Sequence, residues 1–330
     1  MDPSSSTSPA EEQTAQNPWD LVLQTAAETV DGVPAGSKEA KLREICLQTV
    51  KDNKALEKLF YFVGLREGWE SNGNNYDVEC EKVWDDETNQ WVARGVVKYD
   101  KDEYGMTPLD WLQIYRDCPR YEGLDAKATS AKALAEFNKA DFFLRAVYLS
   151  FSGFTVYSGR DFVCAQQVFI LKGNKVAILT TSVPDDKWPQ SVSRYGWGLV
   201  RGFMHFGGAL METLEDGSMQ VTYVAHLDLK TGLPMDMMTI APHLTDFAQP
   251  LTAFKEDFKT KGVTPSPLEA QVAPSLLQEI KERKPSEPQP VLREGKREVE
   301  AAGDGNGVAA AEGDDQVPPA ASPEETKETA

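Results

Sequence analysis

The sequence has few of the residues that usually form metal sites and nucleophilic centres. Its 330 residues include three histidines and four cysteines, and it contains no HExxH, GxSxG or Walker A motif. The cysteines, Cys46, Cys80, Cys118 and Cys164, are far apart and form no zinc-binding spacing. We therefore expect reduced structural thiols, no metal, no cofactor and no catalytic residue, so that the protein is not an enzyme.

Basic residues are also scarce. The chain has 34 Lys and Arg against 52 Asp and Glu, which gives a net charge of −18. This balance opposes the counterion release that drives nucleic-acid binding, and it opposes steady attachment to an anionic membrane. The first residues lack a basic and apolar leader, and no run of the chain is apolar enough to span a bilayer. We expect a cytoplasmic protein that binds no nucleic acid and touches membranes only transiently.

Aromatic residues are absent after Phe258 and before Trp19. Segments without such residues cannot bury enough apolar surface to offset the entropy of ordering them. The composition therefore predicts a disordered tail over 1–17, a short helix and linker over 18–37, one folded domain over 38–260, and a disordered acidic tail rich in Pro and Ala over 261–330. The last tail is a candidate binding segment for a protein partner.

Hydrophobic periodicity predicts an α+β domain. Apolar residues recur at helical spacing from 37 to 64, and alternating segments at 76–84 and 91–100 predict a β-hairpin. Thr107 and Pro108 are typical of a helix start. Six segments between 141 and 229 are short and rich in β-branched and aromatic residues, which predicts an antiparallel sheet. A regular apolar stripe then predicts a last helix to about Lys259, kinked at Pro250.

Three motifs, in this order along the chain, resemble the START family of lipid-transfer domains. Gly159-Arg160-Asp161-Phe162-Val163 is similar to the "RDFV" strand start of the family, and Gly198 to Gly202 is similar to its "GxVR" strand. The segment from Val221 to Pro234 resembles the entry into its last helix. The structural residues that the resemblance assigns are Arg160, Asp161, Arg201, Asp228, Gly232 and Pro234.

The resemblance implies a helix-grip fold, in which a curved antiparallel sheet wraps around a long C-terminal helix and leaves an internal apolar cavity for one sterol or phospholipid. The cavity residues that it implies are Phe162, Cys164, Gln166, Val168, His226, Met237, Ile240, Leu244, Phe247 and Leu251. The C-terminal helix and the 183–196 loop would act as a gate, with Trp188, Tyr195 and Trp197 as the gate aromatics.

One position departs from the family pattern. Many members have an arginine six residues after the arginine of "RDFV", whereas this chain has Gln166. A guanidinium for a phosphate or a buried acid is therefore missing there, and the neutral side chain favours a sterol or another weakly polar lipid.

Several alternatives stay open at this point. His226 is either a buried strand histidine or an acid, base or hydrogen-bond partner for a ligand. Trp188 either packs against the domain or inserts into membranes. Intracellular lipid binding and transfer is the leading function. The alternatives are a ligand-gated regulatory or scaffold protein and, behind it, a helix-grip cyclase or hydrolase.

The domain assignment leads to a first prediction. Deletion of residues 1–17 and of about 262–330 removes no core-forming residue, so affinity for lipid should remain nearly unchanged. Titration of the truncated and full-length proteins with a fluorescent lipid measures this. A truncated protein that folds but no longer binds the lipid would contradict the assignment.

Overall fold

The computed structural model describes residues 37–52, 54–137, 143–153, 158–171, 175–188, 198–230 and 246–262. The predicted N-terminal tail, the boundary at 17 and most of the predicted C-terminal tail lie outside these ranges. The boundary predicted at 37 coincides with the first described residue. The central elements of the predicted domain lie inside them.

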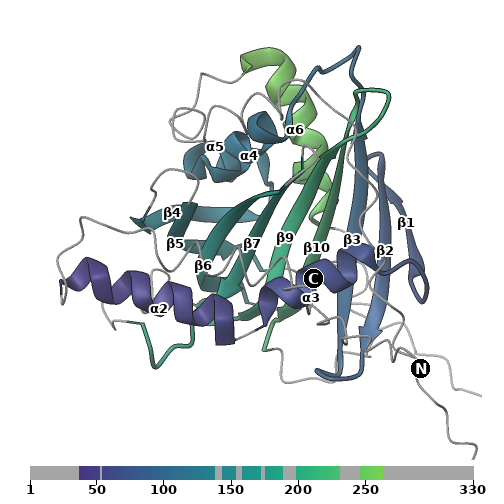
Figure 1. The fold of residues 1–330 in the computed structure, drawn as a ribbon. Coiled ribbons are helices and arrows are strands. Elements are labelled where there is room, and N and C mark those ends of the chain that lie inside the picture. Colours follow the sequence, from purple (N-terminus) through teal and green to yellow (C-terminus); the bar gives the residue numbers. More distant parts are fainter. Residues whose placement is uncertain are drawn as a thin grey trace, which may run out of the picture. The chain divides into compact units, whose positions relative to one another are not determined.

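The core of the fold is a 10-stranded sheet in the order β1-β2-β3-β10-β9-β7-β6-β5-β4 (Figure 1). Neighbouring strands on this path run antiparallel, and the short β8 joins β6 in parallel. The strands are β1 (Glu70–Asn75), β2 (Val78–Asp85), β3 (Gln90–Tyr99), β4 (Ala128–Glu136), β5 (Phe143–Phe151), β6 (Arg160–Leu171), β7 (Lys175–Ser182), β8 (Val200–Arg201), β9 (Phe203–Thr213) and β10 (Met219–Asp228). The α+β class and the antiparallel sheet predicted from the sequence are confirmed.

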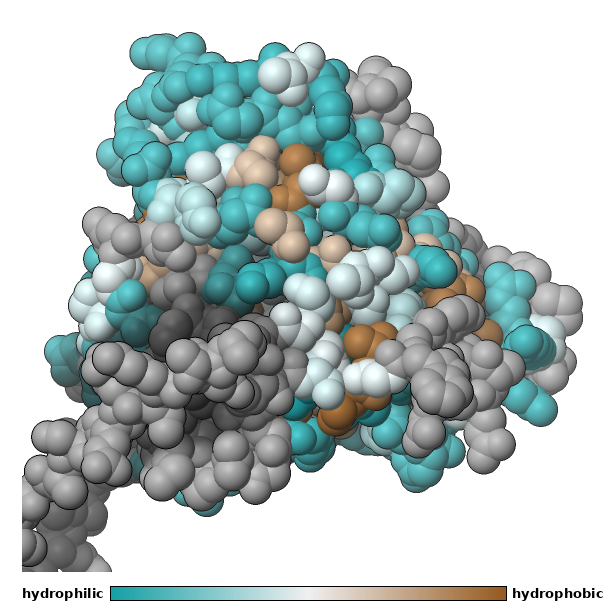
Figure 2. All heavy atoms as spheres, turned by 180° about the vertical axis from the view of Figure 1, so that it is seen from behind, coloured by the Kyte–Doolittle hydropathy of each residue, from teal (hydrophilic) through white to brown (hydrophobic). Residues whose placement is uncertain are grey.

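Helices cover both faces of this sheet. The first pair, α2 (Lys38–Asp52) and α3 (Ala55–Gly64), crosses one face and packs on β5, β6, β7, β9 and β10 (Figure 1). The other group, α4 (Pro108–Arg116), α5 (Cys118–Leu124) and α6 (Ala248–Lys261), lies on the opposite face. We call the first the outer face and the second the inner face. Figure 2 views the molecule from behind, where apolar patches interrupt a mostly hydrophilic surface.

The N-terminal helical region differs from the prediction of one continuous helix over 37–64. It consists of two helices, and Lys54, the residue before α3, has φ 46°, in the left-handed region. A non-glycine residue in this region ends a right-handed helix locally. The periodicity persists across the break because α2 and α3 pack on the same face of the sheet.

The start of α4 confirms the capping prediction. The hydroxyl of Thr107 accepts a hydrogen bond from the backbone N–H of Asp110, and the carboxylate of Asp110 accepts one from the backbone N–H of Thr107. This reciprocal arrangement satisfies two N–H groups that a helix start leaves unpaired. Pro108 occupies the first helical position, where its missing N–H has no consequence.

Sequence patterns missed three elements and divided one strand. No sequence pattern predicts β1, which reads ESNGNN, and none predicts β4 or α5. Two of the six strand segments predicted between 141 and 229 are 198–206 and 208–214, but β9 runs through Gly207 and Gly208 without interruption. A Cβ on Gly208 would stand 1.9 Å from the carbonyl oxygen of Ile178, so this glycine permits close approach of β7 and does not mark a turn.

The predicted C-terminal helix is described from Ala248 to Lys261, and 231–245 lies outside the described residues. Pro250 falls in the first turn of α6 and therefore removes no interior hydrogen bond, so the predicted kink is wrong at this position. Leu251 and Phe254 of the apolar stripe are buried in the core of the inner face.

One charged residue of α6, Asp257, is buried. The side chain of Asp257 is 2% exposed and forms an ion pair with Arg120 of α5. Arg120 also donates to the backbone carbonyl of Gly262, so one guanidinium fastens the end of α6 to α5. The Asp257 carboxylate also accepts from Lys261.

This pair generates a second prediction. Asp257→Ala leaves the Arg120 guanidinium without its carboxylate in a mostly buried position, and should lower the free energy of unfolding by about 3 kcal/mol. Chemical denaturation measures the change. Glu256→Ala, at the exposed neighbouring position, is the control and should stay within about 0.5 kcal/mol of the parent. Equal losses from both variants would contradict the assigned role of the pair.

Candidate functional site

Strand β6 shows how the sheet sorts its side chains. Val163, Ala165 and Phe169 belong to the core of the outer face. Because side chains alternate along a regular strand, the intervening residues point to the inner face. These are Phe162, Cys164, Gln166 and Val168, four of the predicted cavity residues, and the structure therefore brings all four to one face.

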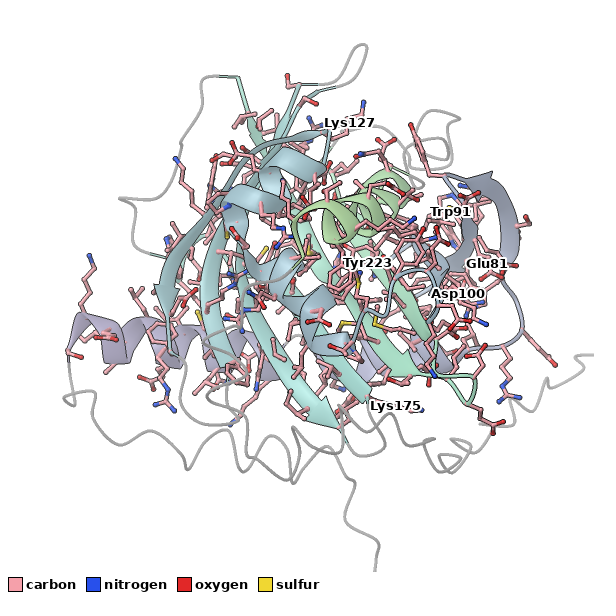
Figure 3. The ribbon with its side chains drawn as sticks, turned by 90° about the horizontal axis from the view of Figure 1, so that it is seen from above. Glu81, Trp91, Asp100, Lys127, Lys175 and Tyr223 are labelled. Atoms are coloured by element: carbon pink, nitrogen blue, oxygen red, sulfur yellow. The ribbon has the colours of Figure 1, made fainter. Side chains whose placement is uncertain are left out.

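The start of the C-terminal helical region lies on the same face. Phe247 stands 5.3 Å from Tyr223 of β10, measured between ring centroids. A Cβ on Gly95 of β3 would approach within 2.3 Å of Phe247 Cε2, so the glycine creates the notch into which this ring fits. The hydroxyl of Tyr99 donates to the carbonyl of Leu251 over 2.7 Å, which anchors α6 to β3. In Figure 3, Tyr223 lies beside α6 over the sheet.

Two adjoining hollows lie between the inner face and its helices. The first, about 20 Å³, is lined by Tyr115, Tyr121, Tyr223, Phe247, Pro250, Leu251 and Phe254. The second, about 10 Å³, is lined by Tyr115, Cys118, Tyr121, Ala131, Arg145, Val147, Leu149 and Gln166. Each has room for about one water molecule, whereas ligand sites usually measure about 300–1,000 Å³. A larger ligand can therefore enter only if the covering segments move.

A buried arginine on the inner face was missed from the sequence. Arg145 of β5 is 3% exposed and pairs in register with Gln166 of β6. Its Nε donates to Gln166 Oε1 over 2.6 Å, and its Nη1 donates to the carbonyl oxygen of Arg116 over 2.6 Å. Gln166 in turn donates to Thr180 Oγ1 over 3.1 Å. The guanidinium that seemed missing at Gln166 thus comes from the neighbouring strand.

The signal for Arg145 was present but ambiguous. It is the one charged residue in the apolar run FFLRAVYLSF, where alternation places it on the same face as Phe143 and Val147. A charge at such a position is either at an exposed edge or buried with partners. The sequence did not reveal the order of the strands. In the structure, β4 and β6 flank β5, so Arg145 lies on an interior strand and is buried.

His226 is not brought together with the other cavity residues. It is fully buried, and its ring stacks on His205 with centroids 4.5 Å apart and lies edge-on to Phe206. Phe206 stacks on Phe62 of α3, which places this cluster on the outer face. His226 Nε2 is 3.1 Å from the hydroxyl of Thr88. The predicted position of His226 in the cavity therefore requires correction, because alternation along β10 directs it away from Gln166.

The motif residues of "RDFV" and "GxVR" form a structural clamp. Arg201 donates from Nε and Nη2 to the two carboxylate oxygens of Asp161, at 2.9 and 3.0 Å, and from Nη1 to Asp185. Arg160 donates to the backbone carbonyls of Leu229 and Ser158. Asp228 accepts from the backbone N–H of Lys230. Gly232 and Pro234 lie outside the described residues.

The predicted gate is described only in part. Trp188 is 7% exposed and belongs to the core of the outer face, so it packs against the domain. Tyr195 and Trp197 of the same loop, and the helix residues Met237, Ile240 and Leu244, lie outside the described residues.

Metal-binding and reactive groups within the ranges that the structure describes have the following arrangement. In that part of the chain, no group of three or more His, Cys, Asp or Glu side chains is placed to hold a metal ion. Burial raises the pKa of the Cys164 thiol to about 12, which keeps it protonated and unreactive. None of the described helices has the length and apolar composition needed to cross a bilayer.

Solved structures of lipid-transfer proteins are similar to this chain. Human StAR-related lipid transfer protein 5 superimposes with a TM-score of 0.52 at 19% sequence identity, over 66% of this chain and 99% of that chain. Human STARD10 gives a TM-score of 0.48 at 14% identity, over 72% of this chain and 87% of that chain. A search of curated proteins found no match.

The antiparallel sheet and the helix packed on its inner face define a helix-grip fold. A family model, the START domain, matches residues 102–245. This match agrees with the resemblance that the three motifs of the sequence suggested.

The buried histidine pair generates a third prediction. Burial, and the charge of His205 in second place, lower the pKa of His226 to about 3, below its ordinary value of 6.5. The unfolded chain therefore takes up this proton first, and the free energy of unfolding falls as pH drops below about 6.5, by up to about 1.4 kcal/mol per pH unit. Denaturation of the parent and of His226→Phe between pH 7 and pH 4 tests this. The variant should lose less stability on acidification, and parallel pH profiles would contradict the assignment.

Proposed function

We propose that this protein binds one sterol or phospholipid between the inner face of the sheet and its C-terminal helix, and transfers it between membranes without changing it chemically. The single observation that carries the proposal is the apolar inner face, where Phe162, Val168 and the helix residue Leu251 are buried and two small hollows lie between the sheet and its helices. Burial of a lipid chain contributes about 0.8 kcal/mol per CH₂, so a carrier needs no reactive group to hold it.

The small size of the hollows supports a gated mechanism. Since neither hollow admits a lipid, uptake requires displacement of the segments that cover the inner face. We propose that the C-terminal helix and the 183–196 loop are those segments. The contacts that would hold the described part of the helix closed are the fit of Phe247 on Gly95 and the hydrogen bond from Tyr99 to Leu251.

Two other functions were considered from the sequence. A helix-grip cyclase or hydrolase would need a polar cluster that joins His226 to Gln166, but these residues lie on opposite faces of the sheet. No observation therefore favours it. The regulatory alternative uses the same ligand site as lipid transfer. The two functions differ only in the consequence of lipid binding, so both require that lipid binding be demonstrated first.

A fourth prediction tests the helix as part of the lipid site. Phe247→Asp places a charge in the notch over Gly95, where it is desolvated, and should abolish recovery of lipid from vesicles. The measurement is the lipid recovered with the re-isolated full-length protein.

The matched control is Glu256→Ala, which changes an exposed position of the same helix. It should leave lipid recovery unchanged. Circular dichroism establishes that the Phe247 variant is folded, and should it fail to fold, Phe247→Ala takes its place with a smaller expected loss. A folded Phe247 variant with undiminished lipid recovery would contradict the proposed site.

A further inference from the structure

Two of the three histidines of the chain meet on the outer face of the sheet, beside a β-bulge. His226 of β10 pairs with Phe206 of β9, and the next pair along the two strands skips His205. Neighbouring residues of a regular strand point to opposite faces. Here the rings of His205 and Phe206 both contact His226, so the bulge turns His205 towards it. Bulges often re-aim a side chain in this way beside a functional site.

A hydroxyl and a carboxylate fix the tautomer of His226. Thr88 Oγ1 donates to Asp85 Oδ2 over 2.8 Å and lies 3.1 Å from His226 Nε2. A hydroxyl carries a single hydrogen, and an ionised carboxylate only accepts. The hydrogen of Thr88 is therefore used for Asp85, and its oxygen accepts from the Nε2–H of His226. The free lone pair of His226 is consequently on Nδ1.

This lone pair lies next to a second histidine nitrogen that is also buried. Neither His226 Nδ1 nor His205 Nε2 has a hydrogen-bond partner among the residues that the structure describes. The whole His226 side chain is buried, and the two ring centroids are 4.5 Å apart. A buried polar atom without a partner costs free energy, and in native proteins such atoms often have a role that includes ion binding.

The charges around the two rings favour a cation. Asp85, Asp228 and Lys58 all act electrostatically on both rings. Lys58 forms an ion pair with Glu87 over 3.1 Å, and Lys230 forms one with Asp228. Three carboxylates thus accompany two ammonium groups in this cluster, and the excess negative charge attracts a positive ion.

We propose that His226 Nδ1 and His205 Nε2 bind a divalent transition-metal ion such as Zn²⁺ on the outer face. Imidazole nitrogen is a favoured ligand of such ions. A metal-binding histidine usually donates its other ring N–H to a fixed acceptor, as His226 does to Thr88, which is held by Asp85. No three His, Cys, Asp or Glu side chains in the described ranges are placed to hold a metal ion, so the pair supplies two ligands and solvent supplies the others.

The site is separate from the proposed lipid site, which lies on the opposite face of the sheet. An ion lies in the plane of each imidazole ring that binds it, whereas the two rings now stack with their planes inclined by 28°. Binding therefore requires one ring to turn. His205 is only half-buried and can turn, while the hydrogen bond to Thr88 holds His226. The sequence did not predict this pair, because only the pairing of β9 with β10 brings the two histidines together.

The test is calorimetric titration of the full-length, metal-free protein with zinc chloride at neutral pH, under conditions that keep the cysteines reduced. The parent should bind one zinc ion per chain. His205→Gln and His226→Gln each remove one ligand and should weaken binding by about a hundredfold. The control is His243→Gln, the same substitution at the third histidine, which lies outside the described residues. It should keep the affinity of the parent.

Thr88 is a positioning residue in this account, and its variants test the tautomer. Thr88→Val removes the hydroxyl that holds the Nε2–H and should weaken zinc binding about tenfold, with the stoichiometry unchanged. Thr88→Ser restores the hydroxyl and should restore the affinity. A merely structural role of Thr88 would change the stability of the metal-free protein and leave the affinity for zinc as it is.

The contrary outcomes are equally definite. A parent that binds no zinc would overturn the site and leave the two histidines as a structural stack. Binding that survives in either His205→Gln or His226→Gln, or that is lost equally in His243→Gln, would overturn it as well. If His226→Gln does not fold, His205→Gln, at the half-buried position, decides the question.

Discussion

The central constraint on this fold is that its sheet is covered on both faces. Strand β6 carries buried residues at nearly every position, so neither set of its side chains faces water. The outer face is closed by α2 and α3, and the inner face is closed by α4, α5 and α6. The outer cover is a continuous aromatic and aliphatic core that includes Phe62, Phe206 and Trp188. The inner cover contains two small hollows and the buried Arg145, and we propose that a ligand exchanges with the protein on this side.

The buried polar groups on the two faces of the sheet have different surroundings. On the outer face, His226 is fully buried and stacks on the half-buried His205, and burial lowers the pKa of His226 to about 3. On the inner face, the buried guanidinium of Arg145 donates to the side chain of Gln166 and to the backbone carbonyl of Arg116. Gln166 lines one of the two described hollows, whereas His226 lines neither. We therefore propose lipid recognition on the inner face.

Sequence patterns identified most of the fold because local signals and tertiary packing agree there. The capping residues Thr107 and Asp110 and the alternation in β2, β3 and β6 each correspond to an observed element. The misses have physical causes. The strand β1 contains no apolar residue, and the break at Lys54 is a backbone conformation that periodicity does not encode. The faces of Arg145 and His226 depend on which strands lie side by side, and this order, with β3 next to β10, is non-local.

The central claim is that the inner face holds one lipid molecule. Native mass spectrometry of the full-length protein, after incubation with vesicles of mixed natural lipids, tests it most directly. The account predicts a folded protein with a mass increase equal to a single lipid, and loss of this species in Phe247→Asp but not in Glu256→Ala. A folded protein that stays at its lipid-free mass, or one that carries several lipids with no dependence on Phe247, would contradict it.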